Sequence, residues 1–478
     1  MQHAKLIELL SHFSLKDLKR LKALADSPFF NTQEPIRALM EFILMYAPDF
    51  SNPKFNYKNA YKHVFGERNI KSDPKTAVAK VMSKLMDLVR HFIIQQELDQ
   101  NPLQQSFYLI RFFKRNSMVQ FIPKLLDDAG DLVDQDPYHD EYYFRYKMLL
   151  ESEWASYLNM TQDKSKPDYN LNGQNEALDM YYALSKLQMY CFAKNEERRV
   201  FVDFDYSQMS QLLQWVEQTN LIQDFTIRTW YKALLLLNDP SIQNFRALKS
   251  AIHQNEMRLN PTNLRMLYSY LANNARVIFS NRQTYFSELF ELYKEQIKLG
   301  TLHINGYLTP VMLRNITIVG LKQREFNWVE QFIHDNSDKI VPTYVEREDT
   351  VALCKAYLHF EKKEYQKTLD VIHTLRYESL FTKMDERRLR MMCYYEMDLK
   401  SPLEDLINSF RKFITDHKKR IPVNYLEENR LFIQFIYKLC STNLKNRENR
   451  QALSDEIRQV PILPEKEWLL TKVEGDRD

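Results

Sequence analysis

Hydrophobic residues recur at helical spacing along most of the chain, and the pattern repeats most clearly between residues 307 and 413. Three successive helix pairs are predicted there, and the second helix of each pair carries a similar set of apolar positions. These sets begin at Phe326, Tyr365 and Leu403, which are 39 and then 38 residues apart. This period is typical of stacked helical hairpins, so the pattern predicts an α-solenoid.

The same alternation of first and second helices extends upstream with less regular spacing. Earlier second helices are predicted to start at Tyr206, Ile242 and Tyr285, which gives successive intervals of 36, 43, 41, 39 and 38 residues. Proline and an adjacent capping residue stand where several of these helices start, as a helical array requires. The first helices of the six pairs are predicted at residues 177–195, 222–237, 262–280, 308–321, 346–361 and 385–398.

Residues 1–98 are predicted to form a separate N-terminal helical domain. Ser14, Asn56 and Asp73 each precede an amphipathic stretch and are expected to cap a helix, and Asn31 with Thr32 is expected to cap another. Alternating Val, Ile and Thr runs and Asn-Gly turns are scarce, so strands are not predicted. The fold class is therefore all-α, with an N-terminal helical domain followed by a right-handed α-solenoid of irregular helix hairpins.

Composition and turn signals place the remaining boundaries. Connecting helices are expected over residues 102–160, the solenoid over 177–441, and a capping helix and tail over 446–478. A polar connection over residues 443–450 is expected to precede the last helix, near residues 451–459. Residues 161–175 collect Pro, Gly, Asn, Asp and Ser without apolar periodicity, which predicts a loop. Trp468 in the tail is expected to cover the open apolar face of the last repeat. The alternative is that it forms a recognition motif exposed to a partner.

Composition argues against the common classes of enzyme. Only 7 glycines occur in 478 residues, whereas nucleotide-binding α/β folds need glycine at tight strand-to-helix turns. No GxxxxGK[ST], GxGxxG, HExxH or GxSxG motif is present, and the eleven histidines are scattered. We therefore predict no catalytic residue, no cofactor and no metal. An enzyme with an unfamiliar helical active site is the remaining alternative in this class.

The four cysteines and the absence of long apolar runs predict a cytoplasmic protein. The cysteines are isolated from one another within apolar helical patterns, so we expect small buried side chains in a reducing compartment. They are Cys191, Cys354, Cys393 and Cys440. The longest aliphatic run covers residues 233–237, far short of the roughly 20 residues of a membrane span.

Charge is uneven along the chain although its total is small. The formal net charge is +3, yet residues 1–95 hold 15 Lys and Arg against 9 Asp and Glu, a net charge of +6. Lys80 and Lys84 lie one helical turn apart on the predicted polar face of their helix and could contact phosphates. The alternative interpretation is an ordinary solvated helix surface.

One segment carries the features of a known repeat. In VALCKAYLHFEKKEYQKTLDVIHTL, the small Ala356 precedes a helix break, and Tyr365 then starts a helix that packs through Leu369 and Ile372. The segment resembles a tetratricopeptide repeat, although Thr368 stands where that family usually has alanine. The layout also resembles that of large uncharacterised bacterial helical-repeat proteins, which have no assigned activity. The resemblance implies a concave groove, lined by first helices, that binds segments or helices of other proteins.

Aligning the three best repeats, and adding neighbouring residues, selects candidate residues for this groove: Arg314, Tyr357 and Tyr395 stand at aligned positions, and Asn315 and Arg388 lie beside aligned positions. The positions expected to face away from the second helices include Arg and Tyr, the side chains enriched at interface hot spots. They are Arg314, Asn315, Tyr357, Arg388 and Tyr395. The alternative is that Tyr357 and Tyr395 only pack between adjacent repeats. The expected function is thus a non-enzymatic scaffold for a protein or peptide partner, and the second hypothesis is a nucleic-acid-associated regulator. The oligomeric state is not predicted.

Overall fold

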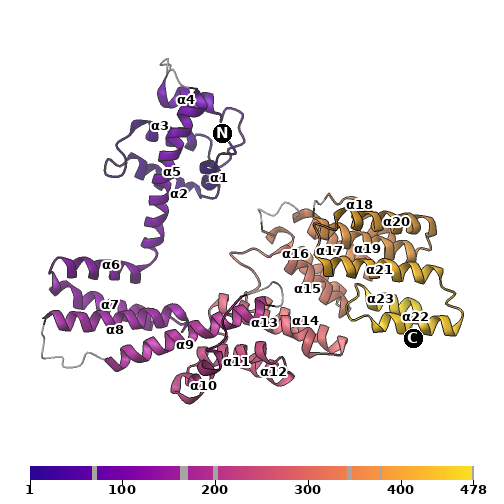
Figure 1. Cartoon of the computed structure of the whole chain (residues 1–478). Coiled ribbons are helices and arrows are strands. Elements are labelled where there is room, and N and C mark those ends of the chain that lie inside the picture. The colour runs from indigo at the N-terminus through magenta and orange to yellow at the C-terminus, as the bar shows by residue number, and fades with distance from the viewer. Residues whose placement is uncertain (67–72, 162–170, 198–202, 342–346, 377–378, 476–478) are drawn as a thin grey trace. The chain divides into compact units, whose positions relative to one another are not determined.

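The computed structural model describes residues 1–66, 73–161, 171–197, 203–341, 347–376 and 379–475. The chain is 77% helical, and the described residues contain 23 α-helices and no strand, only two isolated β-bridges. Helices that follow one another in sequence pack together (Figure 1). The prediction of an all-α, solenoid-like fold is therefore confirmed.

The chain divides into two compact units. Unit 1 comprises Met1–Tyr181 and unit 2 comprises Tyr182–Asp478. The division falls within helix α9 (Leu171–Glu196).

The first five helices of unit 1 enclose one hydrophobic core. α5 is the longest of them, and it extends beyond the other four toward α6 (Figure 1). Buried residues from Leu6 to Phe92 form a single apolar cluster. The helices are α1 (Lys5–Ser11), α2 (Leu15–Asp26), α3 (Glu34–Leu44), α4 (Tyr57–Phe65) and α5 (Pro74–Asp99).

Three of the expected helix caps are present in unit 1 and a fourth is not. The side chains of Ser14, Asn56 and Asp73 each accept a hydrogen bond from the backbone N–H three residues later, at 3.0–3.1 Å. Helix α3 instead begins after Gln33 and has no side-chain cap. The expected cap Asn31 uses its amide to bind the backbone oxygen of Ala25 at 2.7 Å, which shapes the preceding turn.

The remaining helices of unit 1 pack in sequence order, with α6 on α7 and α7 on α8. A salt bridge of 2.5 Å joins Lys114 of α6 to Glu153 of α8. These helices are α6 (Pro102–Arg115), α7 (Ile122–Asp134) and α8 (Glu141–Thr161), with a short 3-10 helix, η1 (Val119–Phe121), before α7.

Unit 2 consists mainly of consecutive helix pairs at the predicted places. Within the repeat, α11 packs on α12 and also on α13, and α15 packs on α16 and also on α17. The predicted first helices correspond to α9, α11 (Phe225–Asn238), α13 (Pro261–Ile278), α15 (Pro310–Lys322), α17 (Arg347–Glu361) and α19 (Leu380–Glu396). The second helices are α10 (Met209–Gln218), α12 (Ile242–Asn255), α14 (Arg282–Lys298), α16 (Phe326–Asn336), α18 (Tyr365–His373) and α20 (Lys400–His417).

Polar contacts in unit 2 recur between residues about one repeat apart. Lys322 binds Glu361 at 2.8 Å, 39 residues further on. Arg388 binds Asn429 at 2.6 Å, 41 residues further on. Each contact joins a first helix to the first helix of the next pair, which is the arrangement that stacking of successive hairpins produces.

Three sequence expectations need correction near loops and the C-terminus. Most of the loop predicted for residues 161–175 lies outside the described residues, but residues 171–175 belong to α9, where Asn175 binds Asp179 one turn on. Residues 447–450 were expected in a polar connection, yet they open α22 (Arg447–Gln459) because Asn446 caps it. After α21 (Val423–Ser441) and α22, the expected tail contains a further helix, α23 (Lys466–Glu474).

Candidate functional site

A recess of about 280 Å³ lies on the first helices of unit 2 and is lined by three of the five candidate residues. Arg314 comes from α15, Tyr357 from α17 and Arg388 from α19, so three consecutive first helices each contribute one of the candidate residues. Tyr425 and Glu428 of α21 continue the series. We call this site the arginine recess; Arg276 of α13, Ile318 of α15, Asp385 of α19 and the C-terminal residues Ile462, Pro464 and Glu465 complete its lining.

A buried carboxylate organises the arginine recess. Asp385 is only 3% exposed and forms ion pairs with Arg314 and with Arg388, three residues later on its own helix. The hydroxyl of Tyr425 donates a hydrogen bond to the same carboxylate at 3.0 Å. Asn429, which is fully buried, accepts from Arg388 at 2.6 Å. These contacts fix the positions of both guanidinium groups before any ligand arrives, and such pre-organisation lowers the entropy that binding costs.

Arg314 and Arg388 of the recess remain charged despite their burial. Burial disfavours the charge of Arg388, but the adjacent Asp385 carboxylate outweighs this effect and the pKa of Arg388 is raised. The pKa of Arg314 is raised by the same balance between burial and Asp385. Burial raises the pKa of the Tyr357 hydroxyl well above its ordinary value, so this side chain stays neutral. The recess therefore offers cationic donors and neutral aromatic surface side by side.

The C-terminal segment, residues 460–475, passes along one side of the arginine recess. Glu467 of α23 forms a salt bridge with Arg282 of α14 at 2.6 Å. The indole Nε1 of Trp468 donates to Glu396 of α19 at 2.7 Å, and Lys472 binds the same carboxylate at 2.8 Å. The segment thus touches helices that are distant from it in sequence.

The other two candidate residues lie elsewhere. Asn315 is partly buried on α15 and is not among the residues that line the arginine recess. Tyr395 lines a second recess of about 440 Å³, and its ring meets that of Trp468 edge-on with centroids 5.4 Å apart. Tyr357 and Tyr395 also both pack against the hydrophobic core of this region. This packing is what the alternative interpretation of the two tyrosines expects.

Sequence analysis found two arginines of the arginine recess but missed Asp385, the carboxylate that both of them bind, and Tyr425 and Glu428 of α21. Asp385 and Arg388 stand three apart in sequence, a spacing that places them on one helix face, and this was the available signal. Tyr425 and Glu428 have the same spacing on α21. A carboxylate on a helix usually faces water, so nothing in the sequence indicates that Asp385 is buried. Its burial becomes evident only in the structure, where it forms an ion pair with Arg314.

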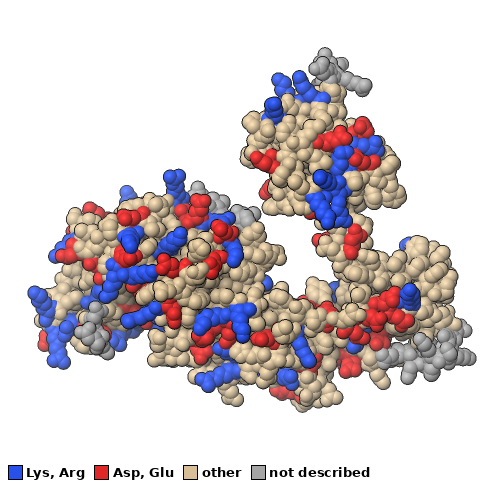
Figure 2. All heavy atoms as spheres, turned by 180° about the vertical axis from the view of Figure 1, so that it is seen from behind, with Lys and Arg blue, Asp and Glu red and all other residues tan. Residues whose placement is uncertain are grey.

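A second candidate surface lies in unit 1 around the predicted phosphate contacts. Lys80 and Lys84 are both exposed on α5, and Lys84 donates to Gln33 at 2.7 Å. Lys84 lines a recess of about 420 Å³ together with Phe29 and Phe30. On the face seen in Figure 2, basic and acidic side chains are interspersed on the molecule rather than separated.

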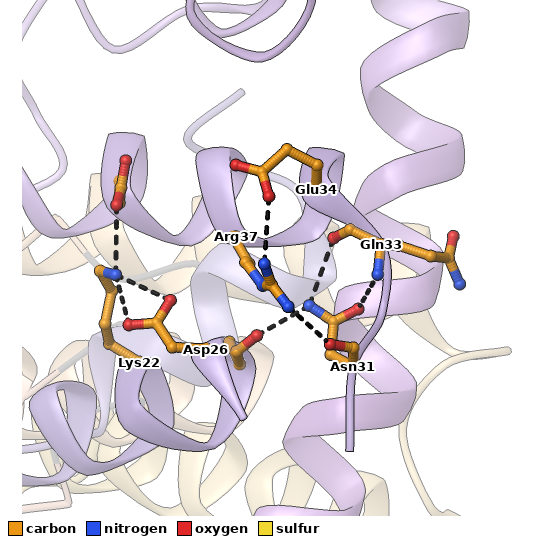
Figure 3. Close-up of polar contacts among 8 residues, drawn as sticks. Lys22, Asp26, Asn31, Gln33, Glu34 and Arg37 are labelled. Atoms are coloured by element: carbon orange, nitrogen blue, oxygen red, sulfur yellow. Dashed lines mark hydrogen bonds and ion pairs between the residues drawn. The ribbon is translucent and has the colours of Figure 1, made fainter. Parts of the chain in front are cut away.

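The turn that carries these phenylalanines is held by polar contacts at its base (Figure 3). Asn31 is 5% exposed, donates to the backbone oxygen of Ala25, and accepts from the Gln33 N–H at 2.9 Å. Arg37 binds the backbone oxygen of Asn31 at 3.2 Å. Phe29 is nevertheless 88% exposed, so a rigid turn presents a large aromatic ring to solvent.

Comparison with known proteins assigns no family to the chain. No protein-family model, curated protein or solved structure matches it. Among the described residues, no group of three or more His, Cys, Asp or Glu side chains is placed to hold a metal ion. No helix in that same part of the chain combines the length and the hydropathy that crossing a membrane requires.

Proposed function

We propose that this protein is a non-enzymatic, cytoplasmic scaffold or adaptor that binds a peptide or helix of a partner protein along the first helices of unit 2. The observation that carries the proposal is the arginine recess, in which Arg314, Tyr357 and Arg388 converge from three consecutive first helices. Arginine and tyrosine are the side chains most enriched at interface hot spots. A site of this composition binds through shape and charge and needs no cofactor.

The partial likeness to tetratricopeptide repeats supports the same proposal. In that family, first helices line a surface that holds extended segments or helices of other proteins. The chain has consecutive helix pairs and polar contacts about one repeat apart, which is consistent with such an array. We therefore place the binding surface on the first helices rather than on the second helices.

Reversal of charge at the rim of the arginine recess tests this proposal. Arg388 is unsuitable as a probe, because it is buried and bound to both Asp385 and Asn429, so its removal would disturb the packing of α19 on α21. Arg276 is exposed and Glu428 is partly buried, so the double change Arg276→Glu with Glu428→Arg alters the site and keeps the net charge. We expect the amount of each partner protein recovered with this variant to be at least tenfold lower than with the wild-type chain, measured by affinity purification and quantitative mass spectrometry.

A matched control uses exposed residues of second helices. Arg246→Glu with Asp405→Arg makes the same charge changes on α12 and α20. These changes should leave the amount of partner protein recovered unchanged. Equal recovery by the wild type and by the recess variant would refute the proposed binding surface.

A second candidate function is nucleic-acid association through unit 1. The observation that favours it is the exposed Phe29 ring in the recess beside Lys84, because single strands are bound by basic grooves with aromatic stacking platforms. Residues 1–95 also carry the net charge of +6. The full chain would then bind a labelled oligonucleotide at low salt, with affinity falling as salt rises.

The lysines allow a sharp test of this second candidate. Lys80→Glu with Lys84→Glu should weaken binding at least tenfold and reduce the salt slope by about 2, since each lost phosphate contact removes about one unit. Lys418→Glu with Lys419→Glu, an exposed pair in unit 2, is the matched control. Absence of a mobility shift for both duplex and single-stranded DNA at low salt would exclude nucleic-acid binding by unit 1.

A further inference from the structure

The C-terminal segment contacts both first and second helices of unit 2, as a ligand bound along the array would. Its first part borders the arginine recess through Ile462, Pro464 and Glu465, and its second part forms α23. Arg282 of α14 and Glu396 of α19 bind side chains of α23 directly. An ordinary terminal cap covers the last hairpin alone, whereas this segment also reaches helices several pairs earlier.

Charge complementarity accompanies these contacts. Glu467 pairs with Arg282 at 2.6 Å, and Glu465 lies in the recess with Arg276 and Arg388. Burial works against the charge of Lys322 on α15, yet the carboxylates of Glu361, Glu465 and Glu467 outweigh it and raise the pKa of this lysine. The acidic side chains of the segment thus pair with Arg282 of α14 and lie near basic side chains of α13, α15 and α19.

Apolar anchors complete the resemblance to a bound helix. Leu469 and Val473 are 0% and 2% exposed and lie four residues apart on the side of α23 that packs into the core shared with α21 and α22. Trp468 adds an edge-on contact with Tyr395 and the hydrogen bond to Glu396. An amphipathic helix recognised in a groove uses the same combination of spaced apolar anchors and flanking charges.

We propose that residues 460–475 act as an intramolecular ligand of the arginine recess, and that the partner is an acidic, helix-forming protein segment with an aromatic anchor that competes with them. This inference rests on the proposed scaffold function and specifies its partner and its regulation. A segment tethered to its own site has a high effective concentration, so it will exclude a similar segment supplied in solution. Weakening the tethered copy should therefore open the site.

The experiment uses the full chain and a labelled synthetic peptide with the sequence of residues 459–475. Glu467→Arg replaces the ion pair with Arg282 by a repulsion, and it leaves the buried anchors Leu469 and Val473 in place. We expect this variant to bind the peptide at least tenfold more tightly than the wild type in fluorescence anisotropy. Hydrogen exchange of residues 466–474 should become at least tenfold faster at the same time.

A reversed ion pair serves as the rescue. Adding Arg282→Glu to Glu467→Arg restores opposite charges at the contact, so exchange should slow again and peptide binding should fall toward the wild-type value. Asp405→Arg, on the exposed side of α20, is the control for a charge change of the same size and should have neither effect. Circular dichroism will show that all variants remain helical.

The outcomes separate this inference from the proposed function. Faster exchange without peptide binding would overturn the inference, because the opened site would then not accept the segment. Dimers formed by mutual exchange of residues 460–475 would support it, since the same contacts would form between copies. If a native partner binds the wild type and Glu467→Arg equally, the inference fails while the scaffold function stands. If the peptide binds but the rim-reversal variant recovers every native partner, the scaffold function fails and the intramolecular contact stands.

Discussion

Asp385 of α19 forms an ion pair with Arg314 of α15, 71 residues earlier in the chain. The carboxylate is almost completely buried, and it also balances the charge of Arg388, which is 8% exposed. This pair therefore connects first helices that are not consecutive. It also makes the stability of the region depend on a single acidic side chain.

The first prediction concerns the loss of this carboxylate. Asp385→Ala leaves a buried arginine without its counter-charge, and breaking a buried pair in this way typically costs about 3–5 kcal/mol. We expect a decrease of that size in the free energy of unfolding, measured by urea titration. Asp405→Ala, at an exposed position of α20, should change it by less than about 0.5 kcal/mol. An effect of Asp385→Ala below about 1 kcal/mol would show that Asp385 is not buried as described.

The second prediction concerns the close contact of α15 with α16. A Cβ atom on Gly320 would lie 2.5 Å from Cγ2 of Val329, so an alanine there must displace its neighbour. Overpacking costs about 1–3 kcal/mol, which exceeds the gain of about 1 kcal/mol in helix propensity. Gly320→Ala should therefore lower the melting temperature. Gly130→Ala, where no atom lies within 4 Å, should raise it or leave it unchanged, and the opposite order would contradict the packing.

The third prediction is a pH dependence of stability centred on Glu295. Burial raises the pKa of this carboxyl, but His253 at 3.0 Å and Lys249 at 3.2 Å outweigh burial, so the pKa lies below the ordinary 4.5. A depressed pKa contributes stability that is present above 4.5 and lost as the pH falls below it. The contribution should be below about 1 kcal/mol, since the pair is partly exposed.

Glu295→Gln tests this dependence. The variant should be less stable than the wild type at pH 7, and the difference in urea midpoint should shrink between about pH 5 and 3. Glu291→Gln, on the exposed side of the same helix, is the control and should show a smaller difference. If the difference in urea midpoint between the wild type and Glu295→Gln instead grew as the pH fell from about 5 to about 3, the pKa of Glu295 would not be depressed in the folded state.

The fourth prediction concerns the cysteines, of which Cys440 is exposed although all four were expected to be buried. Burial raises the pKa of Cys354 and of Cys393 to about 12, and that of Cys191 well above its ordinary value. The thiolate is the reactive form, so these three should be inert in the native chain at pH 8. A thiol-specific reagent should modify one cysteine per chain, and none in Cys440→Ser. Rapid modification of a second thiol would show that a buried cysteine is accessible.

The repeat was predictable because its signals are local and periodic. Apolar positions at helical spacing, with the second helices starting near Phe326, Tyr365 and Leu403, sufficed to locate the helix pairs. Helix α23 was missed because Trp468, Leu469 and Leu470 are consecutive and show no period. Its helical state depends on packing against α21 and α22, which is tertiary information.

The candidate site was only partly predictable for the same physical reason. Arg314 and Tyr357 could be selected because they stand at aligned positions of the repeat, and Arg388 because it lies one turn from such a position, since corresponding faces of stacked hairpins point to the same side. Asp385 could not be identified as part of the site in this way, because a carboxylate on a helix is normally solvated. Its burial follows from a contact across 71 residues of sequence, which no local pattern encodes.

The salt bridge between Arg282 and Glu467 closes a long loop within unit 2. Arrays of hairpins that touch only their nearest neighbours can fray from either end, and they fold quickly because their contacts are local. The contact between α14 and α23 joins residues that are far apart in sequence, so it raises the mean sequence separation of contacting residues. It also ties together the hairpins that lie between these two helices in the chain. The last hairpins of this protein should consequently resist proteolysis together and be lost together, at the cost of slower folding.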